Sequence, residues 1–165
     1  MKSKLPFLSL MACGLALAGC SKSEAPAANS PAASSDASAA VTVELTAGDN
    51  MKFNLNRIEA KPGQDVKVTL TNIGTMPVQA MGHNFILLQK GVDPKDFVNA
   101  AVAAGATGYV PASMSDKIIA HINLLGPKQS GDVTFKAPTE PGEYVFLCSF
   151  PAHFLSGMQG VLVVK

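Results

Sequence analysis

The sequence predicts an all-β fold, a Greek-key sandwich of about eight short strands with one short inserted helix. Two observations support this prediction. Between residues 41 and 165, short apolar or alternating stretches recur, and turn signals such as Lys61-Pro62-Gly63 and Pro141-Gly142 separate them. Only one stretch has a helical pattern, whereas a parallel sheet would need a crossover, usually a helix, between successive strands.

The predicted strands share a period of two or a continuous apolar run, with turn residues on each side. The clearest is 65–72, because Val66, Val68 and Leu70 alternate with polar residues and would form one buried face. The strands are predicted at 41–45, 50–58, 65–72, 84–89, 117–125, 131–136, 143–148 and 160–165.

The inserted helix has signals at both of its ends. Asp93 can cap the helix, Pro94 suits its first position, and Asp96 places a carboxylate in the first turn. The Ala-rich stretch 97–104 favours a helix, and Gly105 is the predicted stop.

The first 19 residues predict a secretory signal peptide. Lys2 and Lys4 precede an apolar run from Leu5 to Leu17, which is too short to span a membrane. The run ends in Leu17-Ala18-Gly19-Cys20, which resembles the lipobox of bacterial lipoproteins. That resemblance implies cleavage before Cys20 and acylation of this residue with several chains, enough for stable anchoring.

An ordinary cleaved signal that happens to end near a Cys is the alternative. By the same resemblance, Ser21 after the anchor implies an outer-membrane address in a cell with two membranes. Residues 20–40 are nearly all Ala, Ser and Pro beyond the anchor, so a disordered tether is predicted. The folded domain is then residues 41–165.

Composition excludes several classes of partner. The chain has 165 residues, of which 47% are hydrophobic and 15% charged, as in one globular domain. Loss of the signal removes Lys2 and Lys4 and no acid, so the formal charge falls from +1 to −1. Neither nucleic acid nor an anionic membrane surface is suggested, and we expect a monomer that meets the membrane only through its lipid.

Cysteine usage points to a special thiol. Of three Cys residues, Cys13 leaves with the signal and Cys20 takes the lipid, so Cys148 alone remains in the domain. No disulfide can form within the domain. An unpaired Cys outside the cytoplasm is either reactive or bound to a metal, with a buried inert thiol as the alternative.

The residues after Cys148 decide in favour of a metal. His153 follows Cys148 by five residues and Met158 follows His153 by five, in a loop between two predicted strands. His83 lies upstream, at the start of another predicted strand. Two imidazoles, one thiolate and one weak thioether form the type-1 blue-copper site. Each of these residues alone has a structural explanation, but their joint occurrence in this order favours a copper site.

The domain resembles azurin, its lipoprotein relatives and the auracyanins, within the cupredoxin family. The motifs that carry the resemblance are Asp49-Asn50-Met51-Lys52-Phe53, Met81-Gly82-His83-Asn84, Ile119-Ala120-His121 and Cys148-Ser149-Phe150-Pro151. The resemblance implies that His83, Cys148 and His153 are the in-plane copper ligands. It also implies that Met158 is the axial ligand, the Gly82 carbonyl a distant axial contact, and Asn84 a hydrogen-bonded link between the first ligand strand and the Cys loop.

The sequence departs from azurin in three places. Azurin has one residue fewer between the loop His and the Met, and the spacing here is similar to that of auracyanin. Azurin has a disulfide near its start, which this chain cannot form. Phe85 stands where a Trp would be expected.

Around His153, expected to be the ligand nearest solvent, the resemblance places an apolar ring that would dock redox partners. Its members are Met51, Met76, Met81, Phe150, Pro151 and Ala152. The partners that the resemblance implies are c-type cytochromes, respiratory complexes, copper nitrite reductases and peroxidases.

Two further residues are predicted to have structural roles and not to bind the metal. The alternation in 118–125 places His121 on a solvent face, so it is predicted to be a surface residue and not a ligand. Tyr144 precedes Cys148 by four residues and fits a tyrosine corner.

The predicted function is a one-electron carrier outside the cytoplasm and not an enzyme. A protein that delivers copper is the alternative, although delivery favours open and exchangeable sites. An enzyme would need an open metal position, and with three His in the chain, two of them committed, a second catalytic copper cannot be built. A structural sandwich without metal is disfavoured by the intact set of four ligands.

Overall fold

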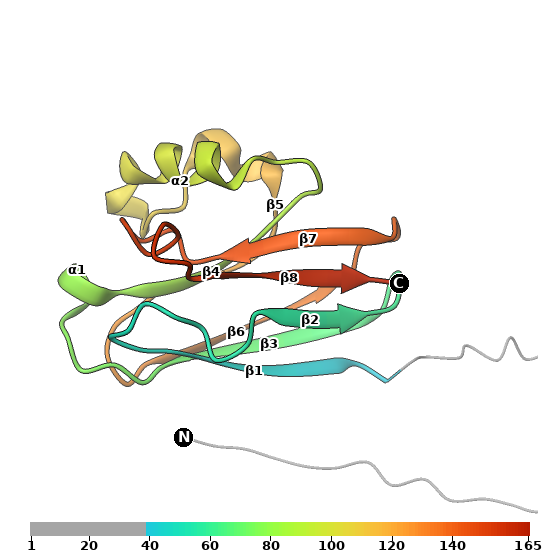
Figure 1. Cartoon of the computed structure of the whole chain (residues 1–165), viewed down its shortest axis with the longest axis horizontal. Helices are drawn as coiled ribbons and strands as arrows, with labels where there is room; N and C mark the ends of the chain where they lie inside the picture. Colours follow the sequence, from blue (N-terminus) through green and yellow to red (C-terminus); the bar gives the residue numbers. More distant parts are fainter. Residues whose placement is uncertain (1–38) are drawn as a thin grey trace, which may run out of the picture. The chain divides into compact units, whose positions relative to one another are not determined.

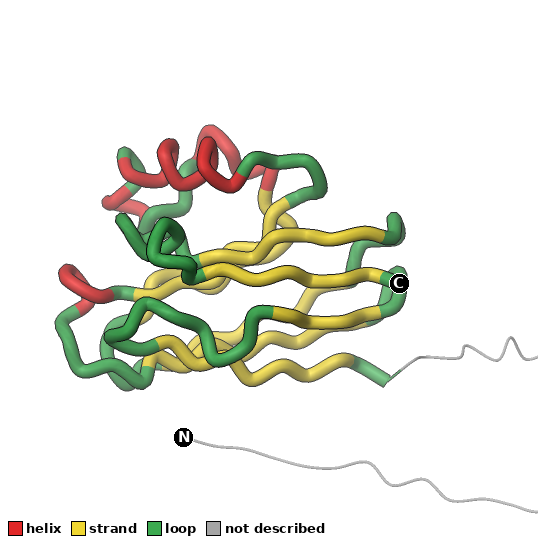
Figure 2. Tube along the Cα trace, viewed as in Figure 1, coloured by secondary structure: helices red, strands yellow, loops and turns green. Residues whose placement is uncertain are grey.

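The computed structural model describes residues 39–165, and the predicted signal, lipid anchor and most of the tether lie outside the described residues. The strands are β1 (Val41–Ala47), β2 (Arg57–Ala60), β3 (Asp65–Asn72), β4 (His83–Leu88), β5 (Ile118–Leu125), β6 (Ser130–Lys136), β7 (Gly142–Leu147) and β8 (Gln159–Val164). The helices are α1 (Val78–Met81) and α2 (Pro94–Val102), with 3₁₀ segments η1 (Gly105–Thr107) and η2 (Ala112–Lys117). Figures 1 and 2 show these elements as a sandwich with helices above one sheet.

The strands form two sheets that face each other. One has the order β1-β3-β6 and the other the order β2-β8-β7-β4-β5. The β1–β3 and β2–β8 pairs are parallel, and the remaining neighbours are antiparallel. The predicted all-β sandwich is confirmed, and seven of the eight predicted strands match the observed ones to within two residues.

The main core fills the space between the two sheets. Val66, Val68 and Leu70 of β3 are 0% exposed, as their alternation predicted. They belong to the same buried cluster as Phe85 and Phe146 of the facing sheet. Burial of these side chains is the main favourable contribution to folding.

A second, smaller core explains why β4 is a continuous apolar run. Every residue of β4 is buried. Phe85 and Leu87 point into the main core, whereas Ile86 and Leu88 pack with Phe97 of α2 on the outer face of the sheet. Because α2 covers that face (Figure 1), both sides of the strand are apolar from Phe85 to Leu88.

The ends of the sandwich differ in what they carry. The start of β4, the end of β7 and the start of β8 lie together, because β4–β7 and β7–β8 are antiparallel. We term this the site end. The chain enters β1 at the opposite end, where the Gln64 side chain donates to the Ala39 carbonyl at 2.6 Å. In Figure 1 β1 begins at the end away from α1.

The predicted strand 50–58 is wrong over most of its length. Residues 48–56 form turns with one isolated bridge, Ala47 to Phe53, and only β2 is a strand. The reason is local hydrogen bonding: the Asn54 side chain accepts from Thr46 N at 2.7 Å and donates to Glu44 O at 3.2 Å. These bonds replace part of a strand ladder, and Met51 adopts a φ of 55°, which is not extended.

The predicted helix begins where expected but ends early. Asp93 caps α2 by accepting from Lys95 N at 2.8 Å, whereas α2 ends at Val102, before the predicted stop. Gly105 instead begins η1, and the left-handed residue is Gly108, with a φ of 67°. The short α1 was not predicted; it begins after Pro77, whose carbonyl accepts from Ala80 N and Met81 N at 2.9 Å.

Two side chains have the structural places expected for them. His121 is exposed on β5. The Tyr144 hydroxyl donates to the Glu140 carbonyl at 2.7 Å, four residues upstream, as in a tyrosine corner. Within residues 39–165, no helix has the length and apolar character needed to cross a membrane.

Candidate metal centre

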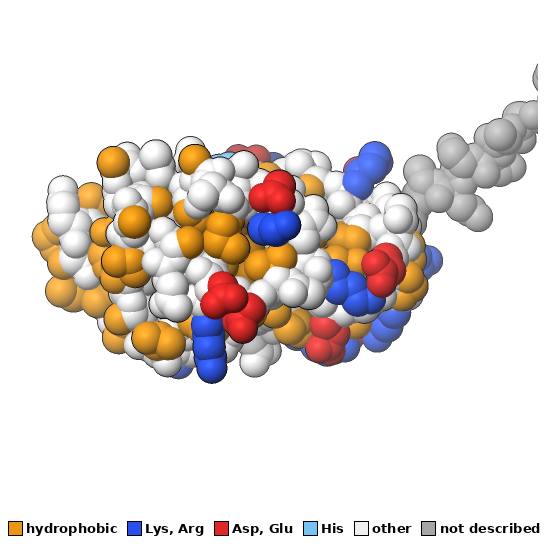
Figure 3. All heavy atoms as spheres, turned by 90° about the horizontal axis from the view of Figure 1, so that it is seen from above, with side chains coloured by type: hydrophobic (Ala, Val, Ile, Leu, Met, Phe, Trp, Pro, Cys, Tyr) orange, Lys and Arg blue, Asp and Glu red, His pale blue; other side chains and the backbone are white. Residues whose placement is uncertain are grey.

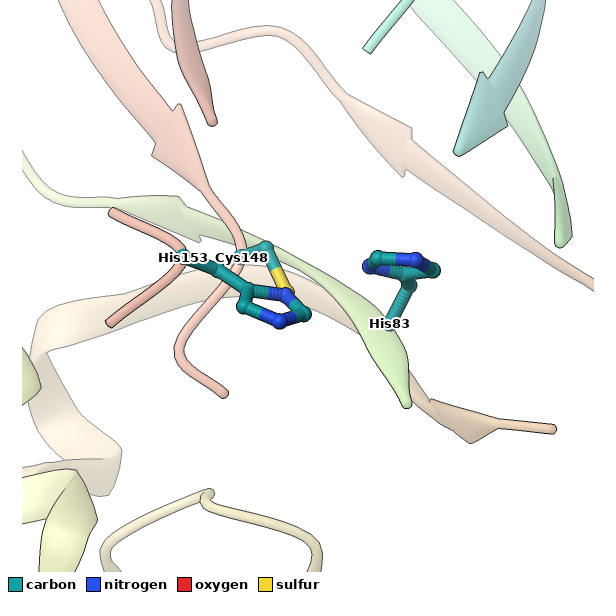
Figure 4. A group of neighbouring side chains, drawn as sticks. All are labelled: His83, Cys148 and His153. Carbon is teal, nitrogen blue, oxygen red and sulfur yellow. The ribbon is translucent and has the colours of Figure 1, made fainter. Parts of the chain in front are cut away.

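The site end brings together three side chains that are far apart in the sequence. His83 is the first residue of β4, Cys148 follows β7 directly, and His153 lies in the loop before β8. One potential ligand atom from each of them lies within 4.8 Å of the others. Figure 4 shows the His153 ring beside the Cys148 sulfur, with His83 facing them from β4.

The loop that carries Cys148 and His153 closes on itself through backbone hydrogen bonds. Cys148 N donates to Met158 O at 3.1 Å, and Met158 N donates to His153 O at 3.0 Å. His153 N donates to Phe150 O at 3.1 Å. The spacing of five residues between the predicted ligands therefore becomes a compact loop with Met158 beside Cys148.

The donor atoms are removed from water. His83, Cys148 and Met158 are 0% exposed and His153 is 2% exposed. Both ring nitrogens of His83 are buried without a hydrogen-bond partner among the described residues. Because an unpaired buried polar group costs about 1–3 kcal/mol, this imidazole is poorly satisfied by the protein alone.

Burial also sets the protonation of the site. It lowers the pKa of His153 to about 4, and the nearby His83 acts in the same direction. Burial likewise lowers the pKa of His83, while the Gly48 backbone and the Asp49 carboxylate oppose that shift. Both imidazoles are therefore neutral at pH 7, the form in which they bind metals.

The thiol behaves differently. Burial raises the pKa of Cys148 to about 12, although the N–H groups of Asn84 and Phe150 favour the thiolate. The Asn84 N–H points at the sulfur from 3.5 Å. The sulfur is therefore protonated at pH 7 in the absence of metal, and a metal that binds it must displace that proton.

The Asn84 side chain holds the ligand loop against β4. It donates to Ser149 Oγ at 2.8 Å and to Gly108 O at 3.0 Å, and it accepts from Ser149 N at 2.8 Å. This is the link expected from the sequence. It fixes the residue next to Cys148 relative to the strand that carries His83.

The donor set fits copper. Two neutral imidazoles and one buried thiol, with a thioether in the same loop, combine the ligands preferred by copper(II) and copper(I). The unpaired nitrogens of His83 agree with a bound cation. Residues 39–165 also match the model of one protein family, described as copper binding proteins of the plastocyanin/azurin type.

The chain belongs to the plastocyanin/azurin family.

Known members of this family are similar over most of the domain. Auracyanin-B of Chloroflexus aurantiacus is 34% identical over 142 residues, covering 84% of this chain and 59% of that protein. Azurin of Pseudomonas fluorescens is 34% identical over 128 residues, which cover 76% of this chain and 97% of that protein. Outer membrane protein H.8 of Neisseria meningitidis is 35% identical, covering 69% of this chain and 61% of that protein.

The structural comparison agrees. The crystal structure of dithionite-reduced auracyanin from Roseiflexus castenholzii matches with a TM-score of 0.68 and 35% identity, over 76% of this chain and 97% of that one. These matches confirm the predicted resemblance to azurin and auracyanin and the assignment of copper as the cofactor.

The remaining predicted residues lie at the site end with different exposure. Gly82 is buried at the end of α1, and a Cβ there would lie 2.7 Å from Val78 O. Met76 and Ala152 are exposed, whereas Met51, Met81 and Pro151 are partly buried.

Phe150 departs from the predicted ring, because it is only 8% exposed. It packs beneath the surface with its ring centroid 4.6 Å from that of His153. Tyr109, which the sequence reasoning missed, packs edge-on against the Phe150 ring, with 5.0 Å between the ring centroids. The one sequence feature that could have pointed to Tyr109 is that it follows Gly108 in an uncharged turn.

Proposed function

We propose that this protein is a one-electron carrier in which His83, Cys148 and His153 would hold one copper ion, with the Met158 thioether as a fourth ligand and the Gly82 carbonyl as a weak further contact. The buried His–Cys–His cluster carries this proposal. Bound copper supplies the chemistry by alternating between its cuprous and cupric states. The alternative remains a protein that delivers copper.

Rigidity of the donor set favours electron transfer over delivery. The loop 148–158 is closed by its own backbone bonds, and Asn84 ties it to β4. All four proposed side-chain ligands are buried. A closed set of this kind changes little between two oxidation states and exchanges its metal slowly. The same closure argues against an enzyme, because catalytic metal sites keep a position open for water or substrate.

We further propose that Cys20 is lipidated and that residues 20–40 tether the domain outside the cytoplasm, at an outer membrane. The entry of the chain at Ala39, opposite the site end, supports this arrangement because the ligands then face away from the attachment point. The similarity to a protein named Outer membrane protein H.8 supports export.

The visible spectrum of the domain with copper(II) tests the electron-carrier proposal. An intense blue band is expected, together with reversible bleaching by a mild reductant, because the Cys148 thiolate binds the metal directly. The Cys148→Ser variant should lack the band entirely. A protein that binds copper but stays weakly coloured would contradict the carrier and favour delivery.

We propose that partners, such as c-type cytochromes or copper and haem reductases and oxidases, dock at the site end. No charged residue occurs in 73–89, 97–115 or 144–164, the segments that carry the ligands and the last six residues of α2. In Figure 3 the end away from the grey trace shows mostly uncharged atoms. An uncharged contact suits brief electron-transfer encounters.

A charge placed in this surface should slow transfer. Met81→Glu is expected to lower the rate of electron transfer to a soluble c-type cytochrome by on the order of tenfold or more, because docking would desolvate an unpaired carboxylate. Stopped-flow mixing measures this rate. The matched variant Lys61→Glu, at the opposite end, should leave it unchanged. Equal rates for all three proteins would place docking elsewhere.

A further inference from the structure

Phe150 lies between a proposed copper ligand and a tyrosine from another part of the chain. Its ring centroid is 4.6 Å from that of His153 and 5.0 Å from that of Tyr109, which meets it edge-on at 67°. Aromatic rings favour such edge-to-face contacts because the positive ring edge meets the negative ring face. The position of Phe150 is therefore restrained by two rings, those of His153 and Tyr109.

The Tyr109 backbone has an unusual conformation. Its φ is 64°, directly after Gly108 with a φ of 67°. A residue with a bulky side chain rarely adopts positive φ, and such strain persists only where the surrounding structure enforces it. Tyr109 N donates to Ala104 O at 2.9 Å, which closes the turn after α2 and aims the ring at Phe150.

The same turn is bonded to the ligand loop through the backbone. Ser149 Oγ donates to Tyr109 O at 2.7 Å, and the Asn84 side chain donates to Gly108 O at 3.0 Å. The turn therefore contacts the two residues that follow Cys148: Tyr109 O accepts from the Ser149 hydroxyl, and the Tyr109 ring packs against Phe150. Two independent contacts thus converge on one residue of the turn.

We propose that Tyr109 is a positioning residue for the copper site, which acts through Phe150 on His153 and through Ser149 on the Cys148 loop. The proposal rests on the copper site described above. Tyr109 keeps Phe150 packed over the His153 ring and so keeps water from that side of the ligand. Because the apolar surroundings of a metal control its access to water and its reduction potential, loss of the ring should stabilise the more charged cupric state.

The test compares reduction potentials of the copper-loaded protein and three single variants. Tyr109→Asn removes the ring but suits positive φ, and Tyr109→Phe keeps the ring. With a fixed redox buffer, Tyr109→Asn should raise the ratio of oxidised to reduced protein by about threefold or more, because greater access of water to His153 favours the more charged oxidised state. Tyr109→Phe should match the unaltered protein. Ser149→Ala, which removes the hydroxyl bonds to Tyr109 O and from the Asn84 side chain, should shift the ratio in the same direction.

A double-mutant cycle separates positioning from general stability. In a Phe150→Leu background, Tyr109→Asn should have a much smaller effect on the ratio, because the ring through which it acts is gone. In copper-free protein, the Phe150 ring should flip faster by NMR when Tyr109 is replaced by Asn.

Two outcomes would overturn the inference. The first is a blue Tyr109→Asn protein with a lower melting temperature but an unchanged ratio and ring-flip rate. The second, if that variant does not fold, is an unchanged ratio in Ser149→Ala. A colourless unaltered protein would instead overturn the copper carrier itself.

Discussion

The copper-free protein is expected to lose roughly 3 kcal/mol of unfolding free energy between pH 7 and pH 4. Burial lowers the pKa of His153 from an ordinary 6.5 to about 4, and it lowers the pKa of His83 in the same direction. Between these pH values the two imidazoles bind protons in the unfolded chain but stay largely neutral in the folded chain. The loss therefore begins as the pH falls below 6.5 and is complete near pH 4.

Urea unfolding of copper-free protein at several pH values measures this loss. His121→Gln provides the matched control, because it replaces an exposed His of β5 that is not one of the two site imidazoles. Bound copper should protect the protein over the upper part of the range, since the metal holds the imidazoles in their neutral form. A copper-free protein equally stable at pH 7 and pH 4 would show that the two imidazoles are not buried in solution.

Replacement of Asn84 by Ala is expected to cost about 3–5 kcal/mol, because three hydrogen bonds of a buried side chain are lost, two of them fully buried, and their partners stay unpaired. The partners are Ser149 N, Ser149 Oγ and Gly108 O, at 2.8, 2.8 and 3.0 Å. Since Ser149 follows Cys148, the loss should also loosen the thiolate. We expect a shifted or weakened blue band in addition to the lower stability.

Asn72→Ala is the control for this prediction. Asn72 is also buried near the site end, where it donates to Leu125 O at 3.1 Å and accepts from Gly74 N at 2.9 Å, but it does not contact the ligand loop. Denaturant unfolding should show a loss of stability in both variants, and the visible spectrum should change only in Asn84→Ala. A spectral change of equal size in Asn72→Ala would mean that Asn84 has no special role at the metal.

The errors in the predicted fold have a common cause. At 50–58, the Asn54 side chain competes for backbone groups that a strand would use. After α2, the chain turns at Gly108 and not at Gly105, because the Tyr109 N–H bonds to Ala104 O. Phe150 was expected at the surface, but Tyr109 and His153 enclose it. Each outcome depends on a partner that no local pattern specifies.

The sequence by itself determined the alternation of buried and exposed strand positions and the type of chemistry. Strand periodicity follows from local backbone geometry, and metal preference follows from the kinds of donor atom. Three of the proposed ligands, Cys148, His153 and Met158, lie on one short loop, so their proximity follows from spacing alone.

Only the tertiary structure decided how His83 meets this loop and how the loop is held. The packing of β4 between two cores brings His83 to the site end, and burial there leaves its imidazole neutral, with neither ring nitrogen hydrogen-bonded within residues 39–165. The turn at Tyr109 reaches the loop because α2, which precedes it, packs across the outer face of the sheet. These features arise from contacts between distant segments, whose hydrogen bonds and desolvation exist only once the sandwich has formed.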